Sequence, residues 1–373
     1  MKSKVTVLKT SPQTVLEDYG KLMRMAGYEA FLPKDKQTFL KINLSWREWY
    51  PAASTEPWQL EGVIKTLIED GYEPASITAL SNHGMGSQAR DAEILNGLTA
   101  GASRQGLEIA RLDEHAVSWI PFTPEAELVV LDRLTGEDDI RVPEALLGNN
   151  IIHLPTIKTH TLSVIAGSAM SWFDTLLTGQ WEKADIHAVL ADLLAVQQEL
   201  CGGVFTVTDG TISGDGPGPR TLIPYKKDYI LAGPDPVAVD SVAARMMGFD
   251  PMQIGYIRMA TERGIGNGEA GEIEIAGDDV SGVDFHFHGG KRPRIPKTDA
   301  VLQYYWYPFR GWPHVGRMAE TEWGQLFQEY LPEGAELDRQ GKGKGPVLAL
   351  AAAAALLSFS AAKRVARMAR RGA

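Results

Sequence analysis

The chain has 373 residues, of which 44% are hydrophobic and 23% charged, the composition of a globular protein with enough apolar material for a real core. Its single cysteine, Cys201, excludes an internal disulfide and also an iron–sulfur cluster held by this chain alone, which would need about four thiolates. The net charge is −10, but residues 339–373 contain eight Lys or Arg and no acid, so residues 1–338 carry −18. Phosphate backbones would repel such a body, which argues against nucleic acid as a partner. The first residues contain no apolar signal segment, so we expect a cytoplasmic protein.

Short β-rich runs alternate with helical patterns along the chain. In the first part, strands are predicted at Val5–Leu8, Phe39–Leu44 and Ser76–Leu80, with helices at 12–26 and Pro57–Asp70. In the second, strands are predicted at Asn150–Leu154, Val204–Thr208 and Tyr229–Ala232, helices at Thr161–Leu177, Ile186–Leu200 and Val237–Met247, and a closing β element at Glu272–Ala276 and Val283–His288. This alternation predicts an α/β fold of two α/β halves with mainly parallel sheets, residues 1–145 and 146–290.

The composition changes after residue 290. Residues 291–338 form an aromatic-rich extended arm, which we expect either to wrap on the body or to touch a membrane interface. Residues 339–373 form a basic, alanine-rich helical tail, in which 17 uncharged residues, 346–362, precede five cations. A bilayer span usually takes about 20 residues, so the alternatives are a helix lying on the inner face of the membrane and a solvated helix.

The segment from Ile151 to His160 is the most informative for function. An apolar strand ends at Pro155, and Lys158 and His160 are expected in the loop before the next helix. Ligands of open α/β sheets bind outside the carboxyl ends of the strands, where the start of the helix would add free N–H groups. A lysine, a histidine and a helix start together predict a site for a small anionic ligand, a carboxylate or a phosphate.

At this segment the chain begins to resemble the domain of unknown function family 362. The matching features are Lys158-Thr159-His160, Lys41-Ile42-Asn43, Ser54-Thr55-x-Pro57, His187 at a helix start, Asp209-Gly210 before a Gly/Pro loop, and the run Asp235 to Asp240. Some relatives carry ferredoxin-like iron–sulfur modules, which implies redox chemistry there. This chain lacks the cysteines, so such chemistry would need an external electron donor. Relatives also tend to have Lys-Asn where this chain has Met170-Ser171.

A fainter resemblance of layout is to the nickel-pincer lactate racemases, in which a histidine-bearing loop also follows an early βα unit. Here the corresponding turn contains His83, directly after a predicted strand. No pair of histidines has the spacing of a known metal motif, so we predict no metal site. A general acid or base role for His160 or His83, with Lys158, is the hypothesis instead.

Further polar residues are expected to complete the pocket. Lys41 and Asn43 lie near the end of a predicted strand, and Thr55 or Ser54 is expected to cap the helix that follows. Asp209 directly follows another strand, where it would orient a base or hold a cation. Asp240 lies among apolar residues of a helix and needs a partner, for which Lys41 and Lys158 are candidates. His187 is included as a helix-start histidine.

These observations give one leading hypothesis: an enzyme that binds an anionic small molecule between the two halves. The reaction is either redox with an external donor or proton transfer next to a carboxylate, as in racemases. The alternative is a non-catalytic, membrane-tethered binding or accessory protein. The sequence identifies no cofactor and no substrate.

Overall fold

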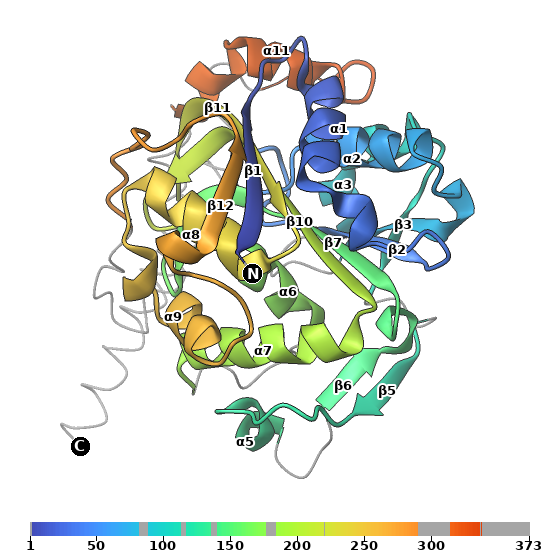
Figure 1. Cartoon of the computed structure of the whole chain (residues 1–373). Helices are drawn as coiled ribbons and strands as arrows, with labels where there is room; N and C mark the ends of the chain where they lie inside the picture. The colour runs from blue at the N-terminus through green and yellow to red at the C-terminus, as the bar shows by residue number, and fades with distance from the viewer. Residues whose placement is uncertain are drawn as a thin grey trace, which may run out of the picture.

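The computed structural model describes residues 2–81, 89–112, 117–135, 140–176, 184–219, 221–289, 314–335 and 337. One mixed sheet runs through it (Figure 1), in the order β12 (Ile273–Gly277), β1 (Ser3–Lys9), β11 (Ile223–Gly233), β10 (Gly203–Asp215), β7 (Asn150–Leu154), β2 (Thr38–Ile42), β3 (Ile77–Ser81) and β4 (Ile109–Arg111). Neighbours from β10 to β4 are parallel, whereas β11 is antiparallel to both β10 and β1. The predicted α/β class is confirmed. Because β2 pairs with β7 and β1 with β11, the two expected halves share this sheet.

One further β unit extends the main sheet, and another stands apart from it. β8 (Thr156–His160) continues from β7 after Pro155, pairs with the second part of β10, and forms a hairpin with β9 (Val164–Ile165). β5 (Trp119–Phe122) and β6 (Ile140–Pro143) form a separate two-stranded ribbon. The prediction that Lys158 and His160 lie in a loop is therefore wrong, because both residues lie in β8.

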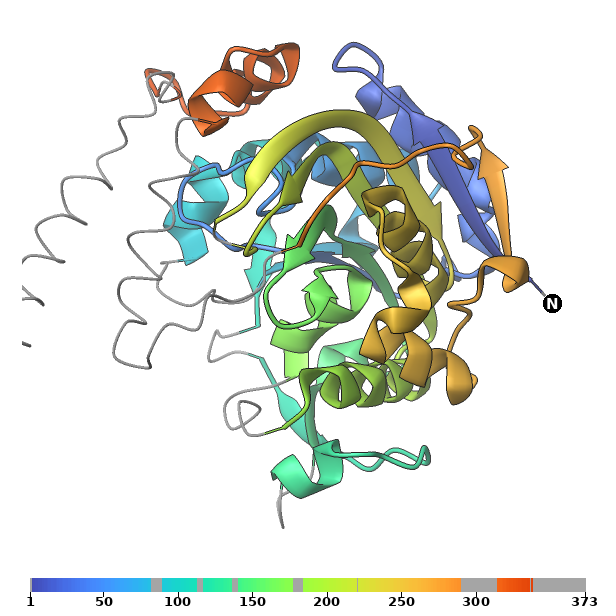
Figure 2. The same cartoon turned by 90° about the vertical axis from the view of Figure 1, so that its left-hand side faces the viewer.

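Helices cover both faces of the sheet, as Figures 1 and 2 show from two directions. They are α1 (Val15–Ala26), α2 (Pro57–Glu69), α3 (Ala89–Leu95), α4 (Leu98–Ser103), α5 (Leu131–Thr135), α6 (Ser168–Leu176), α7 (Ile186–Leu200), α8 (Pro236–Met247), α9 (Gly255–Glu262) and α11 (Glu322–Gln328). Short 3₁₀ turns lie at Tyr28–Ala30, Pro74–Ser76, Glu144–Leu146, Pro251–Gln253 and Ala270–Glu272.

The two faces of the sheet have separate cores because side chains of a strand alternate between faces. In β2, Phe39 packs with the apolar residues of α6 to α9, while Leu40 and Ile42 pack with those of α1, α2 and α11. Strands buried on both faces are near-continuous hydrophobic runs. A polar residue in such a strand, such as Lys41 or His153, is therefore fully enclosed.

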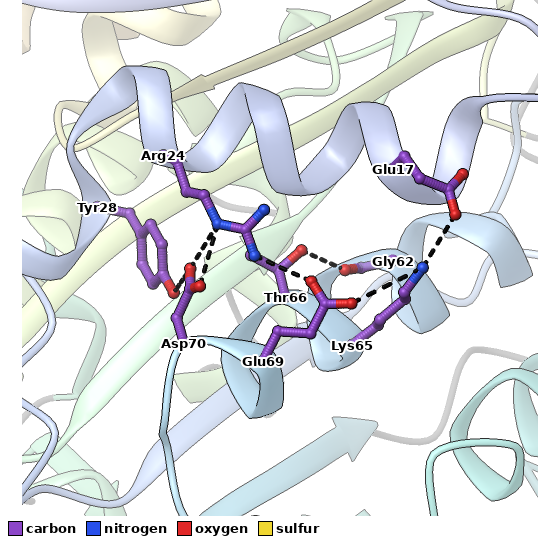
Figure 3. Close-up of polar contacts among 8 residues, drawn as sticks. All are labelled: Glu17, Arg24, Tyr28, Gly62, Lys65, Thr66, Glu69 and Asp70. Atoms are coloured by element: carbon purple, nitrogen blue, oxygen red, sulfur yellow. Dashed lines mark hydrogen bonds and ion pairs between the residues drawn. The ribbon is translucent and has the colours of Figure 1, made fainter.

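Surface ion pairs fasten α1 to α2 (Figure 3). The Arg24 guanidinium binds Asp70 through Nε at 2.9 Å and Glu69 through Nη2 at 2.9 Å, and Lys65 pairs with Glu17 at 3.0 Å. Such exposed pairs contribute little singly, about 0–1 kcal/mol, but together they fix how the helices lie against each other.

The interface between these helices has a close contact that only glycine allows. A Cβ on Gly62 of α2 would lie 2.8 Å from the ring of Tyr19 on α1. The missing side chain lets the Tyr19 ring pass α2 and reach the sheet.

Several other predictions of local structure have a definite outcome. The helix expected at Thr161–Leu177 is shorter, because β9 precedes α6 at Ser168. The sequence Asp235-Pro236 predicts a helix cap followed by a first-turn proline, and this prediction is confirmed. The Asp235 carboxylate accepts from the N–H groups of Val237 and Ala238 at the start of α8. Val283–His288 is not assigned as a strand. Most of the arm and all of the tail lie outside the described residues. Within the described ranges, no helix is long and apolar enough to cross a bilayer.

Candidate functional site

Polar side chains gather where the parallel strands β2, β7 and β10 run toward the loop between β2 and α2. β8 carries Thr156 and Lys158 past the end of β7, and Thr156 lies opposite Asp209 of β10. The β2–α2 loop adds Glu56, the residue just before α2. Glu56, Lys158 and Asp209, each at most 1% exposed, form what we call the carboxylate–lysine cluster.

Every hydrogen-bonding position of the Asp209 carboxylate that faces the protein is occupied. Oδ2 accepts from the Tyr19 hydroxyl at 2.6 Å and from Trp58 Nε1 at 2.9 Å. Oδ1 accepts from Thr211, through its N–H at 2.9 Å and its hydroxyl at 2.7 Å. Four donors suit an ionised carboxylate. They leave little room for a substrate or a cation, the roles that the sequence suggested for Asp209.

Glu56 and Lys158 are connected through Ala52, whose N–H and carbonyl belong to two successive peptide groups. Lys158 Nζ donates to Thr156 Oγ1 at 2.6 Å, and that hydroxyl donates to the Ala52 carbonyl at 2.7 Å. The Ala52 N–H donates to Glu56 Oε1 at 3.2 Å, and Trp49 Nε1 donates to Oε2 at 3.0 Å. The cluster is thus held by backbone and indole groups, which position it firmly.

Burial shifts the ionisation of all three members. Burial lowers the pKa of Lys158 to about 7, although the Glu56 charge opposes the shift. Burial and then the Asp209 charge raise the pKa of Glu56 to about 8, against the hydrogen bonds from Trp49 and Ala52. Burial also raises the pKa of Asp209, while its bonds from Tyr19 and Thr211 hold it down. Titratable groups with such shifts are typical of catalytic sites.

Lys41 lies on the other face of the sheet. It pairs in register with His153, and its Nζ donates to the Ile42 carbonyl at 2.7 Å. His153 contacts Gln197 of α7 and the edge of the Trp172 ring. Burial and then the Lys41 charge lower the pKa of His153 to about 3, so this imidazole is neutral. The structure therefore does not bring Lys41 and Asp209 to one face.

Asn43 and Thr55 form the base of the β2–α2 loop. The Thr55 hydroxyl accepts from the Asn43 N–H at 2.8 Å and donates to the Leu154 carbonyl at 2.7 Å. Thr55 thus ties β2 to β7. The expectation that it caps α2 is wrong, because the cap position belongs to Glu56, whose N–H donates to Gln59 Oε1 at 3.3 Å.

His187 and Asp240 belong to a third group, centred on Tyr256 of α9. The Asp240 carboxylate accepts from the Tyr256 hydroxyl at 2.9 Å and from the Ser168 N–H at 2.8 Å, and His187 Nδ1 accepts from the Tyr256 N–H at 3.2 Å. Burial raises the pKa of Asp240 to about 6. Asp240 does have partners, but they are these groups rather than the two lysines suggested by the sequence. Because Asp240 occupies the start of α6, this helix end is not free to bind a ligand anion.

The two remaining histidines have different outcomes. His160, at the end of β8, has its Nδ1 3.0 Å from the Ser163 hydroxyl within the β8–β9 hairpin. His83 lies outside the described residues. In the described part of the chain, no three His, Cys, Asp or Glu side chains are grouped so as to hold a metal ion.

Glu56 was missed by the sequence analysis. It is the variable position in Ser54-Thr55-x-Pro57, where it looks like a residue of the helix cap. The signal that could have identified it is its position between Trp49 and Trp58, because indoles near a glutamate favour a buried carboxyl with N–H donors.

Helix α11 supports both indoles of the cluster. Trp323 packs on Trp58 with ring centroids 5.1 Å apart, and Phe327 stacks on Trp49 at 4.2 Å. These are the two indoles that donate to Asp209 and Glu56. In Figure 1, α11 lies over the end of the α1–α2 layer, consistent with these contacts.

Comparison with known proteins gives one match. The model of the family described as Domain of unknown function (DUF362) matches residues 38–245, more than half of the chain. The chain belongs to the DUF362 family. No curated protein and no solved structure matches it. The matched DUF362 segment contains all three members of the carboxylate–lysine cluster, whereas Tyr19, Trp323 and Phe327 lie outside it.

Proposed function

We propose that this DUF362 protein is an enzyme that binds a small anionic substrate beside Lys158 and transfers a proton to or from it. The observation that supports this most directly is Lys158 itself, a fully buried lysine at the ligand-binding edge of a parallel sheet with a pKa lowered to about 7. Near neutral pH such a lysine is present both as amine and as ammonium. It can therefore act as a base or an acid, which an ordinary lysine cannot.

The same shift favours an anionic ligand. A carboxylate or phosphate next to Lys158 would stabilise the ammonium form and raise its pKa again. Binding above pH 7 should therefore take up a proton. This coupling distinguishes a site at Lys158 from anion binding at exposed surface lysines.

Proton transfer next to a carboxylate, the racemase-like alternative, is favoured over redox chemistry by the shifted groups of the cluster. Redox chemistry would depend on an external electron donor, since the chain has a single cysteine, Cys201, and cannot hold an iron–sulfur cluster with its own thiolates. A cytoplasmic location, with the tail on the inner membrane face, stays a prediction from the sequence.

The test is calorimetric titration with short mono- and dicarboxylates and inorganic phosphate at pH 8, in two buffers of different ionisation enthalpy. We expect at least one anion to bind with net proton uptake, and Lys158→Met to abolish both binding and uptake. Lys65→Met, which removes a surface ammonium from an ion pair, is the matched control and should change neither. Binding that is unchanged in Lys158→Met would refute the site.

A second measurement tests catalysis. An anion that binds is incubated with the protein in D2O, and its carbon-bound hydrogens are followed by NMR. Exchange that depends on Lys158 supports the enzyme. Binding without exchange or other conversion supports the non-catalytic binding protein instead.

A further inference from the structure

We propose that Glu56 is the acid of this site and holds its transferable proton, and that Asp209 is the positioning residue whose fixed negative charge keeps the proton on Glu56. This inference deepens the proposed function and depends on it only in naming a substrate as the acceptor of the proton. The state of the two carboxyl groups can be tested in the protein without a substrate.

The hydrogen bonds of Asp209 show that it is the ionised member. Two of its four donors, Trp58 Nε1 and the Thr211 N–H, can only donate. The Tyr19 and Thr211 hydroxyls contact the same two oxygens at 2.6 and 2.7 Å. A proton on either oxygen would weaken this set, because each oxygen already accepts two bonds.

Glu56 has room for the proton. The Glu56 carboxyl accepts three bonds, one fewer than Asp209: from Trp49 Nε1, from the Ala52 N–H and, in the capping box, from the Gln59 N–H. The charged and titratable groups that act on it are Asp209, Lys158 and the Tyr19 hydroxyl. Glu56 feels the charges of both Asp209 and Lys158, and a proton on Glu56 avoids a second buried negative charge beside Asp209. Burial raises the pKa of both carboxyl groups, so the larger number of donors to Asp209 is what assigns the proton to Glu56.

The pair of Glu56 and Lys158 then has two states of equal charge. In one, Lys158 is an amine and Glu56 a neutral acid; in the other, Lys158 is an ammonium and Glu56 a carboxylate. If Lys158 takes a proton from the substrate and Glu56 gives one back, the protein passes from the first state to the second. Return of the proton from Lys158 to Glu56 through solvent water restores the first. The substrate neither gains nor loses a proton, so the reaction class is an isomerisation of a small anion.

The experiment is pH-dependent infrared spectroscopy of the full chain, following the C=O stretch of a protonated carboxylic acid. We expect a band at pH 7 that disappears by about pH 9 and is absent in Glu56→Gln. In Asp209→Asn, the band should titrate about one to three pH units lower, because a neighbouring negative charge is gone. Glu61→Gln is the matched control. Glu61 lies in α2, the helix that Glu56 precedes, but its carboxylate is paired with Arg104 and Tyr330. A purely structural Asp209 would leave the midpoint unchanged.

Two outcomes would overturn the assignment. One is a wild-type protein without the band at pH 7. The other is a band that survives in Glu56→Gln and disappears in Asp209→Asn, which would place the proton on Asp209. If a variant fails to fold, as judged by circular dichroism, wild-type protein labelled with ¹³C at the glutamate side-chain carboxyl gives the same answer by NMR. These results are independent of the anion titration, so either proposal can fail alone.

Discussion

Replacing Lys158 by Met should make the protein more stable while it removes the proposed function. Methionine keeps nearly the same length and volume but has no ammonium. The pKa of Lys158 falls from 10.5 to about 7 on folding, and at 1.36 kcal/mol per unit this means that burying the ammonium costs about 5 kcal/mol. Loss of the hydrogen bond from Lys158 Nζ to Thr156 costs the variant about 1 kcal/mol, which offsets part of this gain in stability. At pH 6 Glu56 is neutral in the variant, and the Asp209 carboxylate keeps its four hydrogen-bond donors.

The sign and the pH window follow from the two pKa values. Below pH 7 the lysine is protonated in both the folded and the unfolded state, and the full penalty applies. Between pH 7 and 10.5 only the unfolded state holds the proton, so the penalty shrinks as the pH rises. The gain from Lys158→Met should therefore fall by about 3 kcal/mol between pH 6 and pH 9.

Urea unfolding of both proteins at pH 6, 7.5 and 9 measures this difference directly. Lys65→Met, at a partly exposed lysine on α2, is expected to change stability by less than about 1 kcal/mol at every pH. If Lys158→Met is destabilising at pH 6, or if its effect does not vary with pH, then Lys158 is not a buried lysine with a lowered pKa and the argument for the site fails.

Three further predictions concern residues outside the carboxylate–lysine cluster. Gly62→Ala should displace the Tyr19 ring and lower the free energy of unfolding, measured in urea, by about 1–3 kcal/mol. Gly271→Ala is the control, because open space surrounds Gly271, and it should not destabilise the protein in this way. Equal effects of the two variants would contradict the close contact between Gly62 and Tyr19. Asp240 keeps its proton to about pH 6 when folded and to 3.8 when unfolded, so its contribution to stability falls by about 3 kcal/mol as the pH rises through this interval. Asp240→Asn should remove that fall, and a variant that keeps the wild-type slope would exclude Asp240 as its source. Trp323→Ala should lower the free energy of unfolding by about 3–5 kcal/mol; a loss below about 1 kcal/mol would mean that α11 is not part of the core.

Much of the fold could be predicted because its strands and helices follow strong local patterns. β7 is a continuous buried run, and α8 begins with an aspartate followed by proline, so both were placed nearly correctly. β8 could not be predicted, because its residues are polar and its strand partner, β10, lies about 50 residues away in the chain. Tertiary pairing decided this segment against its local pattern.

The site could be predicted only in part. Lys158 and Asp209 were identified as residues at strand ends, and the structure does bring them to one cluster. Lys41 was grouped with them, but alternation along β2 puts it on the opposite face. Tyr19 was not identified, because a tyrosine on an amphipathic helix looks like any core residue. Only the packing of α1 on α2 brings its hydroxyl to Asp209.

Helix α11 and Tyr19 have a consequence for how far the working unit of this protein extends. The family match ends at residue 245 and begins at residue 38, yet one hydroxyl before it and two aromatic rings after it complete the surroundings of both carboxyl groups. A fragment limited to residues 38–245 would expose the indoles of Trp49 and Trp58 to water. Water near the cluster would weaken the effect of the Asp209 charge on the pKa of Glu56. Residues on both sides of the matched segment thus help to set the acidity of the cluster.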